Sequence, residues 1–420
     1  MSSRSIARLA GALGLVAAVG AVACSDEIDS SGACPLLCAP QSITMRDTVV
    51  EGVAFDSTVG GFPGLGVEGA LLLASLDSLD TRVVVRFDSL PVTFRVGGTD
   101  SAITRVDTAT LSLRLAYPLL TTTVPIVVEA YDVDTTANDT LPETLLPLFR
   151  PDRLLATELV SPASVTDSTV RIFLNTAKVL AHVRDTSRLR VGLRVRAGTQ
   201  GRVSFVSAEG GSPPQLALRV TPDTSVRPLS VTPISETPTT GSFAAGRLLD
   251  YLIVAQQPAA APATSVAVGG LRGQRGYLRF SLPSRIVDSS TVVRATLTLT
   301  QLPYRGPGSG DTLALDVHPT LASGVVTDVR RIVSLIGPPG LDTVRLVPRD
   351  SGLVEFEVAD LVRQWRSAGV DSTLRSLVLR TPTEQTNSAE LRFASRRTAN
   401  AALRPRLRLI YVPRTTTGLP

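Results

Sequence analysis

Residues 110–115 read Thr-Leu-Ser-Leu-Arg-Leu, and residues 406–410 read Arg-Leu-Arg-Leu-Ile. Apolar and polar side chains alternate in both stretches, as is typical of a β-strand with one face in a core and the other in solvent. Similar short runs recur from residue 42 onward, separated by clusters of Gly, Pro, Asp and Ser. Many short strands with little helix predict an all-β protein built from sandwiches.

Helical periodicity occurs at two places in the chain. Residues 175–183 place Val179, Leu180 and Val183 on one stripe, and residues 359–365 do the same with an apolar set that ends at Trp365. We expect each of these short helices to belong to one sandwich. The tryptophan is expected in the core, with its helix closing one end of the sandwich.

The two helices stand at corresponding places in a duplication. Segments correspond in the same order in both halves of the chain: 86–87 with 279–280, 109–113 with 295–299, 170–173 with 353–356, 205–207 with 393–395, and 214–220 with 405–411. A repeat of roughly 190 residues is too long for a solenoid and indicates tandem domains. At the position of Trp365, the first half offers His182 or Val183.

The duplication sets the expected domain organisation. We predict two tandem jelly-roll-like β-sandwiches, each with one short helix, at residues 42–222 and 244–413. Residues 223–243 are rich in Pro, Ser and Thr, a composition that predicts an extended linker. Residues 414–420 are expected to be a polar tail.

The N-terminus has the features of a signal peptide. Arg4 and Arg8 precede an uncharged apolar stretch, 9–22, which leads through small residues into Cys24. This stretch is shorter than the ~20 residues that a membrane-spanning helix needs. The ending Ala-Val-Ala-Cys at 21–24 resembles the bacterial lipoprotein signal, which implies removal of residues 1–23 and lipid attachment to Cys24. The alternative is an ordinary secretory signal. If Cys24 carries the lipid, Ser25 after it favours sorting of the lipoprotein to the outer membrane.

The other two cysteines lie in the expected tether, residues 24–41. Cys34 and Cys38 form an even pair in an oxidising compartment, so we expect a structural disulfide. A metal site would need two further ligands, and His182 and His318, the two histidines of the chain, are far away in sequence.

Several segments of the second half together resemble a known family. Residues 275–283 read Arg-Gly-Tyr-Leu-Arg-Phe-Ser-Leu-Pro, and they are followed by Ala-Thr-Leu-Thr-Leu at 295–299, Phe-Glu-Val at 356–358 leading to Trp365, Phe-Ala-Ser-Arg at 393–396 and Arg-Pro-Arg-Leu at 404–407. This order resembles the DNRLRE family, the disaggregatase-related repeat domains of bacterial and archaeal surface proteins, over residues 245–413.

The match is incomplete in two respects. Residues 42–222 match the family only through the duplication, and Arg397 stands where the family often has an acid. The resemblance implies a jelly-roll-like accessory module, with carbohydrate binding shown or suspected for relatives.

The resemblance to this family suggests a sugar site. Sugar-binding sandwiches stack pyranose rings on aromatic side chains and bind hydroxyls with charged and amide groups. Tyr277 and Tyr304 are the candidates for stacking, and Arg279 and Arg396 are the candidates for contact with an acidic polysaccharide. Only 4% of the residues are aromatic, so no constellation in the sequence itself identifies the site.

The sequence predicts no catalytic set and no cofactor. It has no Gly-x-Ser-x-Gly, no His-Glu-x-x-His and no phosphate loop. Asp132 and Asp134 begin an acidic stretch that resembles a calcium loop, with Glu143 at its twelfth position. Ala137 stands where the sharp turn of such a loop needs glycine, so an acidic loop between strands is favoured over a calcium site.

Charge gives little information about partners. The formal net charge is +5, and Lys178 is the only lysine among 42 basic residues. The arginines are scattered and form no basic stripe, so a nucleic-acid partner is not expected.

Together these features favour a non-enzymatic, lipid-anchored protein of the bacterial envelope. Its domains would lie in the periplasm or outside the cell, with an adhesive, structural or glycan-contact role. Besides the membrane, its expected partner is a polysaccharide or another envelope protein. The alternatives are a dedicated pair of carbohydrate-binding modules and a polysaccharide-cleaving enzyme on a sandwich scaffold.

Overall fold

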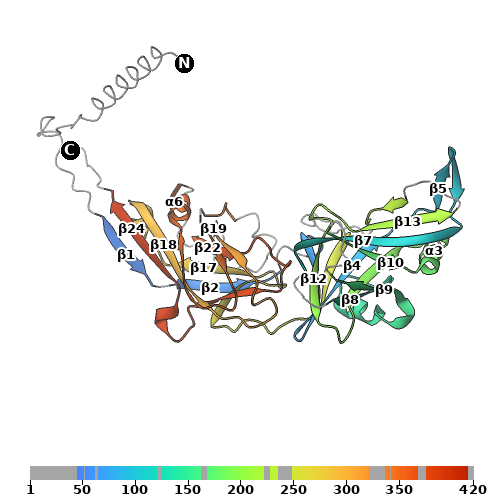
Figure 1. Ribbon diagram of the computed structural model, residues 1–420. Helices are drawn as coiled ribbons and strands as arrows, with labels where there is room; N and C mark the ends of the chain where they lie inside the picture. Colours follow the sequence, from blue (N-terminus) through green and yellow to red (C-terminus); the bar gives the residue numbers. More distant parts are fainter. Residues whose placement is uncertain are drawn as a thin grey trace, which may run out of the picture. The chain divides into compact units, whose positions relative to one another are not determined.

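The described part of the chain is predominantly β-structure. The computed structural model describes residues 45–51, 53–61, 65–120, 125–161, 168–221, 228–234, 248–320, 336–340, 342–367 and 375–414, with the backbone alone at 96, 117–120 and 367. Its named strands pair in antiparallel fashion and form two sandwiches (Figure 1). The all-β sandwich fold predicted from strand alternation is therefore confirmed.

The C-terminal sandwich consists of two separate sheets. In strand order, the first sheet contains β1 (Arg46–Val50), β24 (Arg406–Pro413), β18 (Ser290–Leu302), β23 (Glu390–Ala394) and β16 (Ser265–Gly269), with β21 (Gly352–Glu357) also on β18. The second contains β2 (Val53–Val59), β17 (Arg275–Phe280), β22 (Ser376–Arg380), β19 (Leu313–Thr320) and β20 (Thr343–Leu346). Fully buried side chains such as Leu297, Leu315 and Leu379 form the core between the two sheets.

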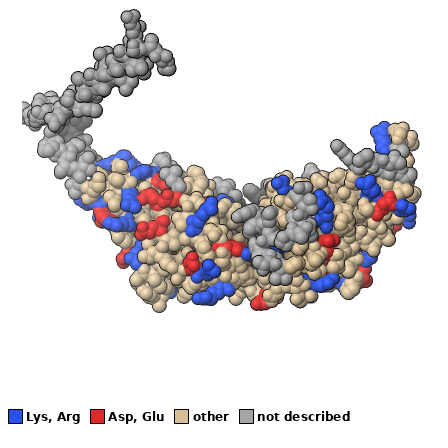
Figure 2. Space-filling view, in the orientation of Figure 1, with Lys and Arg blue, Asp and Glu red and all other residues tan. Residues whose placement is uncertain are grey.

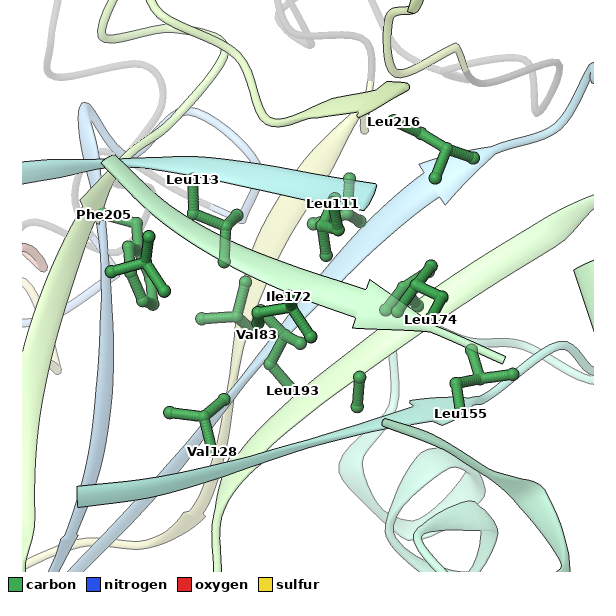
Figure 3. Close-up of a cluster of buried hydrophobic side chains, with 14 of the residues drawn as sticks. Val83, Leu111, Leu113, Val128, Leu155, Ile172, Leu174, Leu193, Phe205 and Leu216 are labelled. Atoms are coloured by element: carbon green, nitrogen blue, oxygen red, sulfur yellow. The ribbon is translucent and has the colours of Figure 1, made fainter. Parts of the chain in front are cut away.

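The N-terminal sandwich is one continuous sheet that folds over itself. In order it contains β14 (Leu229–Val231), β13 (Gln215–Thr221), β7 (Arg105–Leu120), β12 (Gly201–Val206), β3 (Ala70–Leu76), β4 (Leu79–Phe87), β11 (Leu189–Val195), β8 (Ile126–Asp132) and β9 (Leu154–Val160), with β10 (Thr169–Leu174) on β7 and β15 (Asp250–Gln256) on β4. Figure 3 shows core side chains of this sandwich, among them Val83, Leu111 and Ile172, gathered between its strands.

Smaller elements decorate the N-terminal sandwich. A hairpin of β5 (Thr93–Val96) and β6 (Thr99–Ala102) follows β4, and the one-turn helix α2 (Pro142–Leu145) lies between β8 and β9. Tyr131, Phe149 and Tyr251 belong to a second, smaller apolar cluster beside the main core.

Both predicted helices are present. They are α3 (Thr176–Arg184) and α6 (Ala359–Ser367). The side chain of Asn175 accepts a hydrogen bond from the Lys178 amide and caps α3. Trp365 is 1% exposed and belongs to the core, as predicted. The prediction of one short helix per sandwich is too low. Each sandwich has a second, one-turn helix, which is α2 in the N-terminal sandwich and α4 (Ser284–Val287) in the C-terminal one.

The two sandwiches repeat the same pairing scheme. β10 and β13 flank β7 as β21 and β24 flank β18, while β11 and β8 follow β4 as β22 and β19 follow β17. The helix follows β10 in one sandwich and β21 in the other. The pairing therefore relates the same segments that correspond in the sequence.

The first two strands of each repeat are exchanged between the sandwiches. β1 and β2 precede β3 in the chain, yet they pair with β24 and β17 of the C-terminal sandwich. β14 and β15 precede β16, yet they pair with β13 and β4 of the N-terminal sandwich. In Figure 1, β1 and β2, drawn in blue, lie among the orange and red strands that end the chain.

This exchange corrects the expected domain boundaries of 42–222 and 244–413. Residues 46–59 complete the C-terminal sandwich, residues 250–256 belong to the N-terminal one, and part of the expected linker 223–243 forms β14. A repeated sequence makes two equivalent sheet edges, and strand alternation does not say which edge a strand will join.

Candidate functional site

The expected N-terminal features lie outside the described residues. Cys24, Cys34 and Cys38 all fall in residues 1–44, so lipid attachment and the disulfide stay predictions. Among the described residues, no helix is long and apolar enough to cross a membrane.

The two tyrosines expected to stack on sugar rings are buried. Tyr277 is 1% exposed and Tyr304 is 4% exposed, and the guanidinium of Arg392 lies 5.0 Å from the centre of the Tyr304 ring. Burial raises the pKa of each tyrosine to about 12. The prediction is wrong for both residues, because Tyr277 in β17 and Tyr304 in the segment after β18 are buried, away from any sugar in solvent.

The two expected arginines are more accessible but do not form one site with these tyrosines. Arg279 is half-buried on β17, opposite Phe55 of β2. The Arg396 side chain is 41% exposed, and its Nε lies 3.4 Å from a carboxylate oxygen of buried Asp56. Of the four expected sugar-contact residues, Arg396 is therefore the one that is partly exposed and also contacts a buried carboxylate, that of Asp56.

Arginine and histidine side chains form hydrogen bonds with the carboxylates of the acidic stretch 132–139. His182 Nε2 lies 3.1 Å from Asp132 Oδ2, and Arg188 Nε donates to Asp134 at 2.6 Å. Burial is the largest single effect on Asp132 and opposes its ionisation. The hydrogen bonds with His182 and with the Asp134 N–H, together with the charges of His182 and Arg153, outweigh burial and lower the pKa of Asp132. Conversely, the bond to Asp132 raises the pKa of His182.

A buried ion-pair network continues from this acidic stretch. Asp139 accepts hydrogen bonds from Arg86 and Arg190, and Arg190 also contacts Asp88 at 3.1 Å. Among the described residues, no group of three or more His, Cys, Asp or Glu side chains is placed to hold a metal ion. On the face shown in Figure 2, blue and red side chains are likewise interspersed.

His318 lies in strand β19. It is 6% exposed, and its Nδ1 lies 3.0 Å from the Gly337 carbonyl oxygen. Burial lowers its pKa below the usual value, so the ring is neutral at pH 7. His318 and His182 lie in different sandwiches and form no shared site.

A polar pocket of about 340 Å³ lies in the C-terminal sandwich, beside Asp56. We call it the Asp56 pocket. Its walls are residues 56–58 of β2, residues 260–263 and 265–266, Gln274, Ser395 and Arg397. Because β2 is an exchanged strand, segments far apart in sequence meet here.

Two buried polar atoms of this pocket have no hydrogen-bond partner among the described residues. They are Ser57 Oγ and Gln274 Oε1, and Gln274 is 6% exposed as a whole. Asp56 Oδ2, by contrast, accepts the backbone N–H of Arg396. Buried polar groups are nearly always paired, so two unpaired atoms on residues that line one pocket make this pocket the candidate binding site.

The N-terminal sandwich has an equivalent arrangement with different charges. Asp250 of β15 accepts the backbone N–H of Ala208 at 3.0 Å, as Asp56 accepts that of Arg396. Ser207, which precedes Ala208, donates to the Glu68 carbonyl, and Ser395 likewise donates to the carbonyl of Ala263. The two sites are therefore copies of one structure.

In the N-terminal copy, Ala208 and Glu209 stand where the C-terminal copy has Arg396 and Arg397. Glu68 is 3% exposed and Asp250 is fully buried, and Glu209 lies near both; we call these three residues the acidic cluster. Burial raises the pKa of Glu68 and of Asp250 to about 7. The hydrogen bonds that these carboxyl groups accept from backbone N–H groups lower the pKa, but by less than burial raises it. The negative charge of Glu209 acts in the same direction as burial.

The two copies therefore differ in chemistry. The Asp56 pocket offers an amide oxygen, a hydroxyl and the cationic Arg397, which suit a ligand with hydroxyl groups and negative charge. The acidic cluster brings three carboxyl groups together and suits no anion. None of the described residues that line the Asp56 pocket is aromatic, so binding there would rest on hydrogen bonds and charge.

Sequence reasoning finds only half of this site. Residues 205–207 and 393–395 correspond in the sequence and form equivalent loops, and Arg396 is one of the expected sugar contacts. Asp56 and Asp250 were not predicted, because the spacing between the first two strands differs in the two repeats. The recurrence of an acid in the second strand of each repeat is the signal that could have revealed them.

Comparisons with known proteins add no family. No family model matches the chain, and no curated protein matches it. Among solved structures, the VP2 subviral particle of infectious bursal disease virus aligns at 10% identity over 89% of this chain and 78% of that chain, with a TM-score of 0.12. The structure of the Gx strain of the same virus aligns at 11% identity over 89% and 77%, with a TM-score of 0.15. Likeness at these TM-scores carries no argument about function.

Proposed function

We propose that the protein is a non-enzymatic, lipid-anchored protein of the bacterial cell envelope that contacts glycans through the Asp56 pocket. Three observations support this: the lipoprotein-like ending at Cys24, the resemblance of residues 245–413 to the DNRLRE family, and the polar pocket in the sandwich that contains this region.

The unpaired Gln274 Oε1 in the Asp56 pocket carries the glycan proposal. A buried acceptor without a partner costs about 1–3 kcal/mol, and a ligand hydroxyl that donates to it recovers that free energy. Ser57 also lines the pocket and carries a hydroxyl that can accept or donate. A sugar ring carries adjacent hydroxyls that can pair with groups of both kinds.

Arg397 favours an acidic sugar in this pocket. Its guanidinium is a donor that pairs well with a carboxylate, and Arg396 beside it is partly exposed. Without aromatic stacking, a single contact would be weak. Many anchored copies on one surface would bind a polymer far more tightly than one copy does.

Binding to uronic-acid polymers, measured by glycan array and pull-down, tests the glycan contact. We expect the full chain to retain such a polymer, and Gln274→Ala with Ser57→Ala to weaken retention by about tenfold, the effect of roughly 1.4 kcal/mol. Gln215→Ala, at an exposed position of β13, is the matched control and should bind as the unaltered chain does. Equal binding by all variants would remove the Asp56 pocket from the proposal.

Two further measurements test the rest of the proposal. Mass spectrometry of the protein purified from membranes should show an acylated N-terminus at Cys24; an unmodified N-terminus elsewhere would contradict lipid anchoring. A reducing-end assay should show no cleavage of the bound polymer. New reducing ends would instead make the chain an enzyme.

A further inference from the structure

The C-terminal sandwich obtains two strands from a distant part of the chain. β1 pairs with β24 and β2 pairs with β17, although the whole N-terminal sandwich lies between β2 and β16 in sequence. Without β1 and β2, the edges of β24 and β17 would expose unpaired backbone groups that can accept another strand. The acceptor edges therefore do not require a donor from the neighbouring segment.

The donor strands make the same contacts in both sandwiches. Asp56 lies opposite Leu278 of β17, and Asp250 lies opposite Val85 of β4. Each of these acids accepts a backbone N–H from the loop that follows an equivalent strand, β23 or β12. An acceptor edge thus recognises a strand pair with this pattern wherever it comes from.

Within the described residues, the fold holds one of the two donor pairs at both ends and the other at one end only. β14 and β15 lie between β13 and β16, so the fold holds them at both ends. β1 and β2 connect to the rest of the described fold only through residues 60–69. A donor held at one end can reach the equivalent edge of a second molecule.

We propose that β1 and β2 of one copy complete the C-terminal sandwich of a second copy, and the reverse, to give a symmetric strand-exchanged dimer. Each Asp56 pocket of the dimer takes Asp56 and Ser57 from the other chain. Exchange of an identical element makes the same contacts as the monomer does. The balance therefore depends on concentration, and a short connector between donor and acceptor corresponds to an effective concentration of roughly millimolar.

Two single-cysteine chains test this exchange. Val49 of β1 lies opposite Arg408 of β24, and both side chains are exposed. With the three native cysteines replaced by serine, Val49→Cys in one chain and Arg408→Cys in another are mixed in urea and refolded together. The chains are refolded at two protein concentrations, about 1 mM and about 10 µM. These lie near and well below the concentration at which pairing between chains competes with pairing within one chain. The control mixes Val49→Cys with Ala217→Cys, which lies on β13 where β14 already pairs.

At the higher concentration we expect the first mixture to give a disulfide-linked heterodimer, in a yield severalfold above that of the control. At the lower concentration this heterodimer should not form. Light scattering of the cysteine-free chain, refolded in the same way, should show a dimer at the higher concentration. Circular dichroism first verifies that each variant refolds alone. A yield equal to that of the control, or a chain that stays monomeric at both concentrations, would overturn the exchange.

Discussion

Burial of two carboxyl groups makes the N-terminal sandwich sensitive to pH. The folded-state pKa of Glu68 and Asp250 is raised to about 7, whereas both groups titrate near pH 4 when unfolded. Their contribution to stability is complete below pH 4, and it is lost as the pH rises through 7. Each group contributes on the order of 4 kcal/mol at most, since one pKa unit corresponds to about 1.4 kcal/mol.

The free energy of unfolding, measured in urea from pH 5 to pH 8, should therefore fall as the pH rises. The double variant Glu68→Gln with Asp250→Asn should show a clearly smaller fall than the unaltered chain. Asp100→Asn, at an exposed position of β6, should leave the slope unchanged. Identical slopes in the double variant and the unaltered chain would contradict a raised pKa at both carboxyls.

The buried arginine network gives a second expectation for single residues. Arg190 is 2% exposed and contacts both Asp88 and Asp139. Arg190→Met should lower the free energy of unfolding by about 3–5 kcal/mol, because it leaves buried carboxylates without one of their cations. Urea unfolding followed by circular dichroism measures this. Arg105→Met, at an exposed ion pair, should change the midpoint little, and an equally small loss for Arg190→Met would show that the network is not structural.

Single residues were predictable where one physical term decides their position. Trp365 lies in the core because its helix has one apolar stripe and a large apolar side chain favours burial. Tyr277 was misplaced because strand alternation leaves the direction of the inner face open, and register decides it. Tyr304 was misplaced because it follows β18 in a segment with no strand pattern, where tertiary packing alone decides burial. The amide oxygen of Gln274 could not be found at all, since nothing in a sequence shows that a hydrogen bond is missing.

Equivalent strands of the two repeats differ by one residue in register. The sequence aligns Phe173 with Phe356, yet Phe173 is 61% exposed and Phe356 is 1% exposed. In the pairing, Leu111 of β7 lies opposite Ile172, and the corresponding Leu297 of β18 lies opposite Phe356. A shift of one position turns a side chain to the other face of the sheet.

This shift predicts opposite outcomes for two matching substitutions. Phe356→Ala should lower the free energy of unfolding by about 3–5 kcal/mol, because it leaves a cavity in the C-terminal core. Phe173→Ala should change it by about 0.5 kcal/mol or less, because that side chain is in solvent. Fluorescence of Trp365, the only tryptophan, follows the first transition in urea, and circular dichroism follows the second. Equal losses would contradict the one-residue difference in register between the two strands.

Elements with a strong local pattern were predicted well from the sequence. β7, β13 and β24 alternate clearly, and α3 and α6 have apolar stripes, so their existence follows from local side-chain order. β14 was missed because it is three residues long within a Pro-rich segment. Its stability comes from pairing with β13, which local sequence does not encode.

At the scale of the whole molecule, the duplication is visible in the sequence but the strand exchange is not. Each repeat begins with two strands, and the two pairs of strands join equivalent edges of the two sandwiches. Because of the exchange, β1 at the start of the described chain pairs with β24 at its end. It also builds the Asp56 pocket, because β2 supplies one wall and segments beyond residue 260 supply the others.

Pairing of β1 with β24 is therefore the central claim, and a disulfide formed within one chain tests it most directly. Paired Cα atoms of antiparallel strands lie about 4.5–5.5 Å apart, within the range that a disulfide spans. Val49→Cys is combined with Arg408→Cys in one chain and with Ala217→Cys in another, both without the native cysteines and both refolded at low concentration. Without exchange, β1 would lie on β13, opposite Ala217, in the place that Ser230 of β14 occupies. The structure predicts a monomeric disulfide in the first chain and none in the second, whereas a disulfide in the second chain alone would contradict it.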